Sequence, residues 1–201
     1  ENKEIETFLE DYVYYALLMI TLYEVNADKK ALEKSIKIMN DTWELFFNKE
    51  TQLFQKNIIK DNDLFASPID LNDSNIPNGN SVYLLISNKL YSITNDKIWS
   101  ERNEVLKKSF HQVLNSYYSQ MFSFIKTLDI CDNSLSFTFS GTSQSIKEIQ
   151  LYLQKEYLGV ATFVYQLNND TKPSVIVCKK QTCSNKLTNK SEADEYLSKS
   201  Y

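Results

Sequence analysis

The chain is poor in the residues that most nucleotide and metal sites require. Its 201 residues include only three glycines, three prolines, three cysteines and one histidine. A dinucleotide or phosphate loop needs closely spaced glycines, often with a lysine, and a structural zinc site needs four clustered ligands. The turn "FSGTS" has one glycine and no lysine, so it indicates a plain strand-to-helix turn. We therefore predict no metal and no cofactor.

Arginine is nearly absent as well. Arg102 is the only arginine among 22 basic residues, which stand against 26 acidic residues for a net charge of −4. Phosphate recognition usually needs a positive field and forked guanidinium groups. Nucleic acid is therefore not an expected partner.

Long hydrophobic runs are also missing. The longest apolar stretch runs from Tyr12 to Tyr23, well short of the roughly 20 residues that a membrane-spanning helix needs. No cleavable signal peptide is visible, so we expect a cytoplasmic protein without a membrane partner. The chain begins at Glu1 and not at a methionine, which is compatible with a piece excised from a longer protein.

The three cysteines, Cys131, Cys178 and Cys183, are scattered and form no C-x-x-C pair. Reduced, structural cysteines are the expected state. Cys178 and Cys183 flank a polar tetrapeptide and are too isolated for zinc, so we expect a structural or redox-silent pair.

The composition is that of a folded globular protein. Hydrophobic residues make up 42%, charged residues 24% and aromatic residues 13% of the chain, and the aromatic share predicts large, rigid contacts in the core.

The first part of the chain follows a helical pattern twice. "TFLE", residues 7–10, resembles a capping box, which predicts a helix from Phe8. This helix is apolar all round, so we expect it to be buried on every side. Asp28 is the expected cap of an amphipathic second helix, and Asp96 caps the equivalent helix further along. Residues 1–131 are thus expected to form helical hairpins.

The stretch from Asn48 to Asn80 is too long for a simple connector and contains strand-like pieces, "TQLFQKN" and "DLFASPIDL". It ends in "NIPNGNS", residues 75–81, which we interpret as a helix start. Pro77 stops the extended chain, Gly79 permits a positive φ, and Asn80 or Ser81 caps a helix from Val82. Both mainly apolar helices should then start on one face of the bundle.

From about Asp132 the pattern changes. "SLSFTFS" alternates with period two, a helical segment follows Gly141, and "VATFVYQ" and "SVIVC" predict short strands before a terminal helix. Residues 132–201 therefore predict a small β-α-β-β-α subdomain, and the fold class is mainly α with a small α/β part.

Three segments, "LEDYVYYALLMITLYE", "NIPNGNSVYLLISNKL" and "VIVCKKQTCS", together resemble the C-terminal part of the YyaL-type, spermatogenesis-associated thioredoxin-domain proteins. This resemblance implies that the helical hairpins are part of an α/α toroid similar to N-acylglucosamine 2-epimerases and six-hairpin glycosidases. Asn78 departs from the serine of the family's P-S-G-N-S start. The family's thioredoxin half and its C-x-x-C are not in this sequence, so the disulfide chemistry of thioredoxin is not expected.

The resemblance implies a cleft where the apolar helices start. Asp11 is the candidate catalytic residue, and the ligand-binding candidates are Glu10, Asp11, Tyr12, Asp70, Asn78, Gly79, Asn80 and Ser81. The alternative is that Glu10 completes the capping box, Asp11 complements the helix dipole, and the asparagines serve as ordinary caps. We expect Asn78 to matter little for folding.

Two functions remain open. The first is a non-catalytic C-terminal module of a thioredoxin-domain-containing protein, whose partner is the thioredoxin-like domain of the parent chain. The alternative is a domain that binds or processes a small carbohydrate, like an epimerase or a glycosidase. Asp70 or Asp73 could supply the second carboxylate of a glycosidase. The epimerases of this fold use paired histidines, whereas His111 is alone. Whether a reaction is catalysed stays open.

Overall fold

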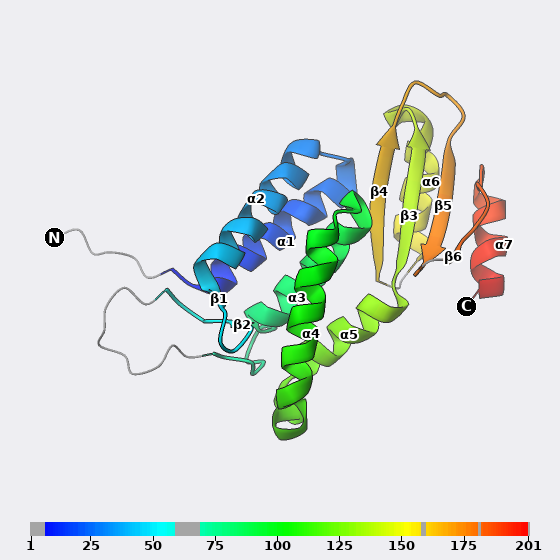
Figure 1. Ribbon diagram of the computed structural model, residues 1–201. Coiled ribbons are helices and arrows are strands. Elements are labelled where there is room, and N and C mark those ends of the chain that lie inside the picture. The colour runs from blue at the N-terminus through cyan, green and yellow to red at the C-terminus, as the bar shows by residue number, and fades with distance from the viewer. Residues whose placement is uncertain (1–6, 59–68, 158–159, 181, 201) are drawn as a thin grey trace. The chain divides into compact units, whose positions relative to one another are not determined.

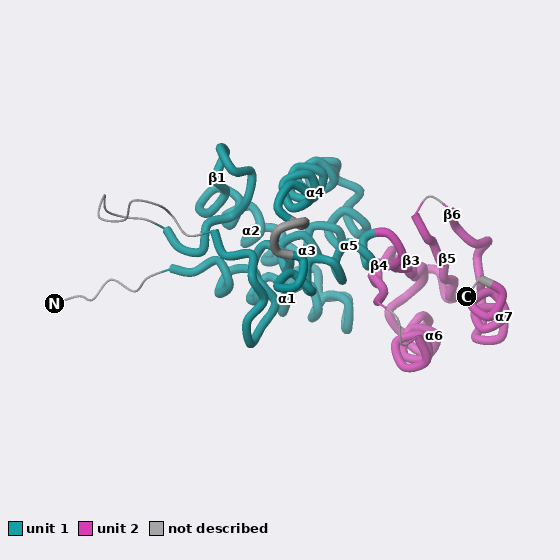
Figure 2. The backbone as a smooth tube through the Cα atoms, turned by 90° about the horizontal axis from the view of Figure 1, so that it is seen from below, with its two compact units in different colours: residues 1–131 teal, residues 132–201 magenta. Residues whose placement is uncertain are grey.

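The computed structural model describes residues 7–58, 69–157, 160–180 and 182–200 of the chain. These residues divide into two compact units, residues 1–131 and 132–201, which Figure 2 colours separately. The first unit is helical, with one short hairpin, and the second combines a sheet with helices. The fold class is therefore mainly α with a small α/β part, as predicted. None of the described helices has the length and apolarity to cross a membrane.

The first unit contains two successive helical hairpins (Figure 1). They are α1 (Leu9–Asn26) with α2 (Lys29–Phe46), and α3 (Gly79–Thr94) with α4 (Lys97–Tyr117). A 3₁₀ turn, η1 (Tyr118–Gln120), and α5 (Phe122–Asn133) follow.

The two hairpin turns use the same local device. Ala27 and Asn95 adopt left-handed conformations with φ of 60° and 55° and end the first helix of each hairpin. Asp28 then accepts hydrogen bonds from the amides of Lys30 and Ala31, and Asp96 accepts one from Ile98. The two predicted aspartate caps are confirmed.

The start of α1 differs from the prediction. The helix begins at Leu9, and its N-cap Phe8 has no side-chain cap hydrogen bond, so the predicted Thr7 capping box is wrong. A short hairpin consists of β1 (Phe47–Asn48) and β2 (Leu53–Phe54). The extended segment that follows it pairs with the residues at the start of α1, in place of a side-chain cap. Phe8 pairs with Asn57, and the Leu9 amide donates to the Lys56 carbonyl at 2.9 Å. "TQLFQKN" thus includes a strand, whereas most of "DLFASPIDL" lies outside the described residues.

The prediction that α1 is buried on every side is wrong. Its inner face is fully buried and includes Val13, Ala16 and Ile20. The opposite face exposes four apolar side chains, hereafter the outer stripe: Tyr15, Leu18, Leu22 and Val25. The reason is that α1 packs mainly against α2 and α3, which cover only part of its circumference.

Aromatic side chains fill the core of the first unit. The Trp43 ring stacks on Phe47 with centroids 3.9 Å apart, and Phe110 stacks on Phe124 at 3.8 Å. The single arginine is part of this core: the Arg102 guanidinium lies 4.7 Å from the centre of the Trp43 ring and donates to the Tyr83 hydroxyl. Burial raises the pKa of Tyr83, and the Arg102 charge only partly offsets this. Arg102 thus stabilises the core and is not available to a phosphate.

The second unit is built around a four-stranded sheet in the order β4-β3-β5-β6. Its elements are β3 (Leu135–Gly141), α6 (Ser143–Glu156), β4 (Ala161–Leu167), β5 (Ser174–Lys179), β6 (Thr182–Cys183) and α7 (Lys190–Ser200). β3 pairs parallel with β4 and antiparallel with β5.

The strand β3 has one buried face, as its period-two pattern predicted. Leu135, Phe137 and Phe139 are buried in the core of the second unit, and the residues between them are half-buried. In "FSGTS", Gly141 has a φ of 140° and Thr142 caps α6 by accepting from the Ser145 amide. This segment is the plain strand-to-helix turn that the sequence indicated.

Candidate functional site

The starts of α1 and α3 lie side by side, as the sequence indicated. A Cβ atom added to Gly79 would lie 2.6 Å from Leu9 Cδ2 and 3.3 Å from Glu10 Oε1. The Tyr14 hydroxyl also donates to the Pro77 carbonyl at 3.0 Å. Gly79 does not have a positive φ, so that prediction is wrong. Glycine is required here because the two helices approach each other too closely for a side chain.

The start of α3 was predicted three residues too late. The helix begins at Gly79 and not at Val82, and its N-cap is Asn78, whose side chain accepts from the Ser81 amide at 3.0 Å. Asn80 and Ser81 are therefore not the caps. Ser81 is buried, and its hydroxyl donates to the Asn78 side chain at 3.1 Å.

Asn80 instead pairs with a strand. Its side-chain oxygen accepts from the Phe54 amide at 2.8 Å, and its side-chain nitrogen donates to the Phe54 carbonyl at 3.1 Å. Asn80 is fully buried. An amide side chain offers one donor and one acceptor on the same edge, as a backbone does, so Asn80 extends the pairing of β2 into the core. Because it is fully buried, its side chain is not accessible to a ligand.

Asn78 and Asp73 form a polar cluster with Ser123 of α5. The Asn78 side chain donates to Leu71, Asp73 and Ser123, and Asp73 accepts from the Asn78 amide at 3.0 Å and the Ser123 amide at 2.6 Å. Burial alone would raise the pKa of Asp73, but the hydrogen bonds from Ser123 and Asn78 outweigh it, so this pKa is lowered. The cluster connects the loop before α3 to the starts of α3 and α5. This contradicts the expectation that Asn78 matters little for folding.

Two further candidates also serve the fold. The Asp70 carboxylate forms an ion pair with Lys56 at 3.2 Å and accepts from the Asn72 amide. The Tyr12 ring packs edge-on against Phe46, with centroids 5.3 Å apart. Asp70 thus has a charged partner and the Tyr12 ring contributes to packing, while their role in ligand binding stays a prediction.

Glu10 and Asp11 are the candidates that stay free. Glu10 is half-buried and Asp11 is exposed, and neither forms a hydrogen bond or an ion pair within the described ranges. Burial raises the pKa of Tyr14, and the charges of Glu10 and Asp73 raise it further. The start of α1 therefore presents negative charge at the positive end of a helix dipole, where it is stabilised.

A cavity not predicted from the sequence lies beside this region. Its volume is about 510 Å³, and it is lined by Glu50, Thr51, Leu53, Ile69, Leu71, Asn72, Ser109, Gln112 and Val113. These residues come from the β1–β2 hairpin, the loop before α3, and α4. Sequence reasoning missed the cavity because it joins three separate segments, none of which has a recognisable motif.

The single histidine has no catalytic partner among the described residues. His111 is exposed on α4, and its ring lies edge-on to Phe124 with centroids 6.5 Å apart. Within the described ranges, no three His, Cys, Asp or Glu side chains group as a metal site would require.

Comparisons with known proteins identify no family. No family model matches the chain, and no curated protein matches it. Among solved structures, a glycoside hydrolase family 76 mannosidase from Bacteroides thetaiotaomicron is similar, with 18% identity and a TM-score of 0.42 over 56% of this chain. The match spans 30% of that protein. At this level the similarity carries no functional argument, and the resemblance to the YyaL-type proteins stays a prediction.

Proposed function

We propose that this chain is a non-catalytic helical module that packs against an apolar helix of a partner domain through the outer stripe of α1. The observation that carries this proposal is the exposure of Tyr15, Leu18, Leu22 and Val25, at 47%, 53%, 39% and 57%. Scattered exposed apolar residues are ordinary, but a continuous apolar patch marks an interaction surface.

The spacing of the stripe supports a helix as its occupant. The four residues follow one another at intervals of three, four and three, the repeat by which one helix packs against another along a seam. The same helix already packs against α2 and α3 with its other faces. A partner helix on the outer stripe would continue this layer of helices. The resemblance to thioredoxin-domain proteins supports placing that helix in a domain of the parent protein.

The chemistry at the helix starts supports a non-catalytic role. Hydrolysis of a glycosidic bond needs two carboxyl groups that flank the bond. Glu10 and Asp11 have no hydrogen bond or ion pair within the described ranges, but successive residues on a helix point about 100° apart and do not face each other. Asp73 accepts hydrogen bonds from Asn78 and Ser123, and Asp70 forms an ion pair with Lys56. Among these four carboxylates, only Glu10 and Asp11 lack a hydrogen bond or ion pair within the described residues, and these two do not face each other.

The test compares self-association of the wild type with that of a Leu18→Gln, Leu22→Gln double variant. Without its partner, the exposed stripe should make the wild type associate reversibly at high concentration in sedimentation experiments. The variant should stay monomeric with a nearly unchanged melting temperature, because both side chains are exposed and lie outside the core.

The matched control is Glu33→Gln, Lys34→Gln, which changes two exposed residues of α2. It should associate like the wild type. A thioredoxin-like domain added in trans should bind the wild type and the control but not the stripe variant. A wild type that stays monomeric and binds no added domain, or a stripe variant that associates equally well, would show the proposal to be wrong.

A second function, binding of a small carbohydrate, is favoured by the cavity beside α4. Its volume lies within the usual range for small-molecule sites, roughly 300–1,000 Å³, and Glu50 and Gln112 present side chains suited to sugar hydroxyls. A panel of monosaccharides should then raise the melting temperature of the wild type but not that of Gln112→Ala. Glu104→Ala, an exposed change elsewhere on α4, is the control. The absence of any shift in the wild type would rule out the tested sugars.

A further inference from the structure

The second unit contains a disulfide between Cys178 and Cys183 at the edge of its sheet. This corrects the expectation that all the cysteines are reduced. Cys178 lies near the end of β5, and Cys183 lies directly opposite it on β6, the two-residue strand at the edge. The bridge therefore links two neighbouring strands close to their turn and closes a very short loop.

Both cysteines lie outside the core of the second unit. That core consists of residues from β3, α6 and β4, together with Val175 and Val177 of β5, Leu187 and Ala193. Cys178 is half-buried and Cys183 is exposed. An attacking thiolate can reach the bridge without opening the core, and exposed disulfides exchange more readily than buried ones.

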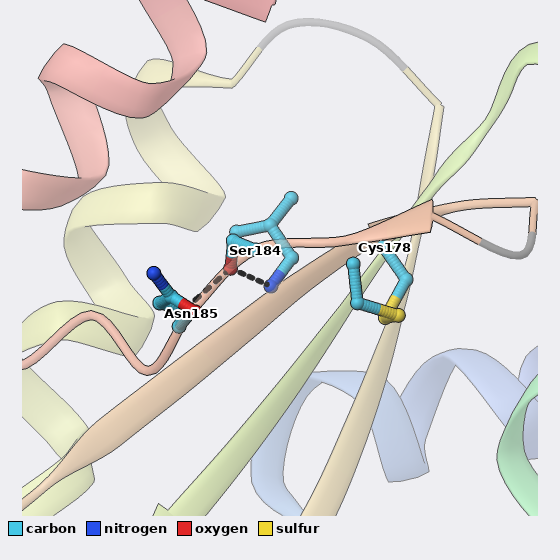
Figure 3. The surroundings of a disulfide bond; sticks show 5 residues. Cys178, Ser184 and Asn185 are labelled. Carbon is cyan, nitrogen blue, oxygen red and sulfur yellow. Dashed lines mark hydrogen bonds between the residues drawn. A yellow bond between two sulfur atoms is a disulfide. The ribbon is translucent and has the colours of Figure 1, made fainter.

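The segment after the bridge is held to β5 independently of the sulfur atoms. The Ser184 amide donates to the Val177 carbonyl at 2.8 Å, and the Ser184 hydroxyl accepts from the Val177 amide at 3.0 Å. The same hydroxyl donates to the Asn185 carbonyl at 2.7 Å, as Figure 3 shows. Further along, Val175 and Leu187 exchange two backbone hydrogen bonds. Breaking the bridge would leave these contacts at the base of the hairpin in place.

The chain around the bridge is basic. Lys179 and Lys180 directly follow Cys178, Lys186 lies three residues after Cys183, and residues 174–189 contain no Asp or Glu. Nearby positive charge lowers the pKa of a thiol and improves it as a leaving group. The bridge is thus exposed at Cys183, lies outside the core and belongs to a basic segment of the chain.

We propose that the Cys178–Cys183 disulfide is a thiol–disulfide exchange site that a dithiol reduces in the folded protein. A thiolate of the dithiol attacks the exposed Cys183 sulfur, the S–S bond breaks, and Cys178 leaves as a thiolate that takes up a proton. The second thiol of the reductant then attacks the mixed disulfide and releases the Cys183 thiol. The protein disulfide gains two electrons, and the dithiol becomes a disulfide. This proposal does not depend on the proposed function of the first unit.

The test uses the full chain with Cys131→Ser, so that only the bridge contributes thiols. The folded, oxidised protein is treated with dithiothreitol without denaturant, thiols are counted with a chromogenic disulfide, and circular dichroism follows folding. We expect two thiols per chain and an unchanged spectrum. Release should be roughly ten-fold or more faster than global unfolding, because an exposed bridge needs no global opening. Oxidised glutathione should then restore the bridge.

Single variants test the direction of attack. In the same Cys131→Ser background, Cys178→Ser leaves only Cys183, and Cys183→Ser leaves only Cys178. The remaining Cys183 should react with the chromogenic disulfide several-fold faster than the remaining Cys178, because it is the more exposed. If thiols are released only as the protein unfolds, or if reduction alone melts the second unit, the bridge is purely structural and the proposal is wrong.

Discussion

Substitution of Gly79 by alanine tests whether the contact between the two helix starts is as close as the structure has it. The added Cβ would lie 2.6 Å from Leu9 Cδ2 and 2.7 Å from Leu9 Cγ. Leu9 is 1% exposed and belongs to the core of the first unit, so its side chain has no free space to move into. The variant must therefore push the starts of α1 and α3 apart.

The expected cost follows from two opposing effects. Overpacking a well-packed core costs about 1–3 kcal/mol. Alanine is favoured over glycine by up to about 1 kcal/mol inside a helix, and by less at the first position, where Gly79 lies. The net destabilisation should be about 1–2 kcal/mol, which corresponds to a fall of very roughly 3–10 °C in melting temperature for a unit of this size.

The decisive assay is a double-mutant cycle with Leu9→Ala, followed by urea and thermal unfolding. Leu9→Ala alone should cost about 2–5 kcal/mol, because it removes a buried leucine. In that background, Gly79→Ala should be neutral or slightly stabilising, because the new methyl group occupies the vacated space. The two changes should therefore be coupled by about 1–3 kcal/mol.

An alternative explanation makes the opposite prediction. If Gly79 were required for a positive φ, Gly79→Ala would be equally costly in the wild type and in the Leu9→Ala background, because backbone strain is local. Additive costs in the cycle would therefore refute the contact explanation. Gly141→Ala in the second unit, where φ is 140° and a Cβ would also lie 2.7 Å from Ser145 Oγ, is the control for additivity and should cost the same in both backgrounds.

Two more predictions concern the polar groups around the helix starts. Asn80→Ala should cost about 2–4 kcal/mol in urea unfolding, because it leaves the buried amide and carbonyl of Phe54 unpaired; a cost no larger than that of the exposed control Ser92→Ala would contradict the role of Asn80. The pKa of Asp73 is lower in the folded state than in the unfolded state. Its carboxylate therefore stabilises the fold at a pH above the unfolded-state pKa, and this stabilisation is lost as the pH falls through the folded-state pKa. The melting-temperature difference between wild type and Asp73→Asn should therefore shrink steadily as the pH falls below the ordinary aspartate pKa of 3.8, and a difference that does not change with pH would count against this assignment.

The sequence alone determined those features whose causes lie within a few residues. Asp28 and Asp96 cap their helices through amides two or three residues away, and the alternation from Leu135 to Gly141 specifies a strand with one buried face. Such interactions depend on local spacing, which the sequence shows directly. The change from helical to strand-rich pattern near Asp132 is visible for the same reason.

Only the tertiary structure decided the roles of the residues at the helix starts. Asn80 looks like a cap in the sequence, but its partner Phe54 is 26 residues away. Gly79 looks like a turn glycine, but its requirement comes from Leu9 on another helix. The outer stripe of α1 looks like core, and it is exposed because α2 and α3 cover the other faces of the helix. In each case a side chain of one type suits several environments, and the packing of distant segments selects among them.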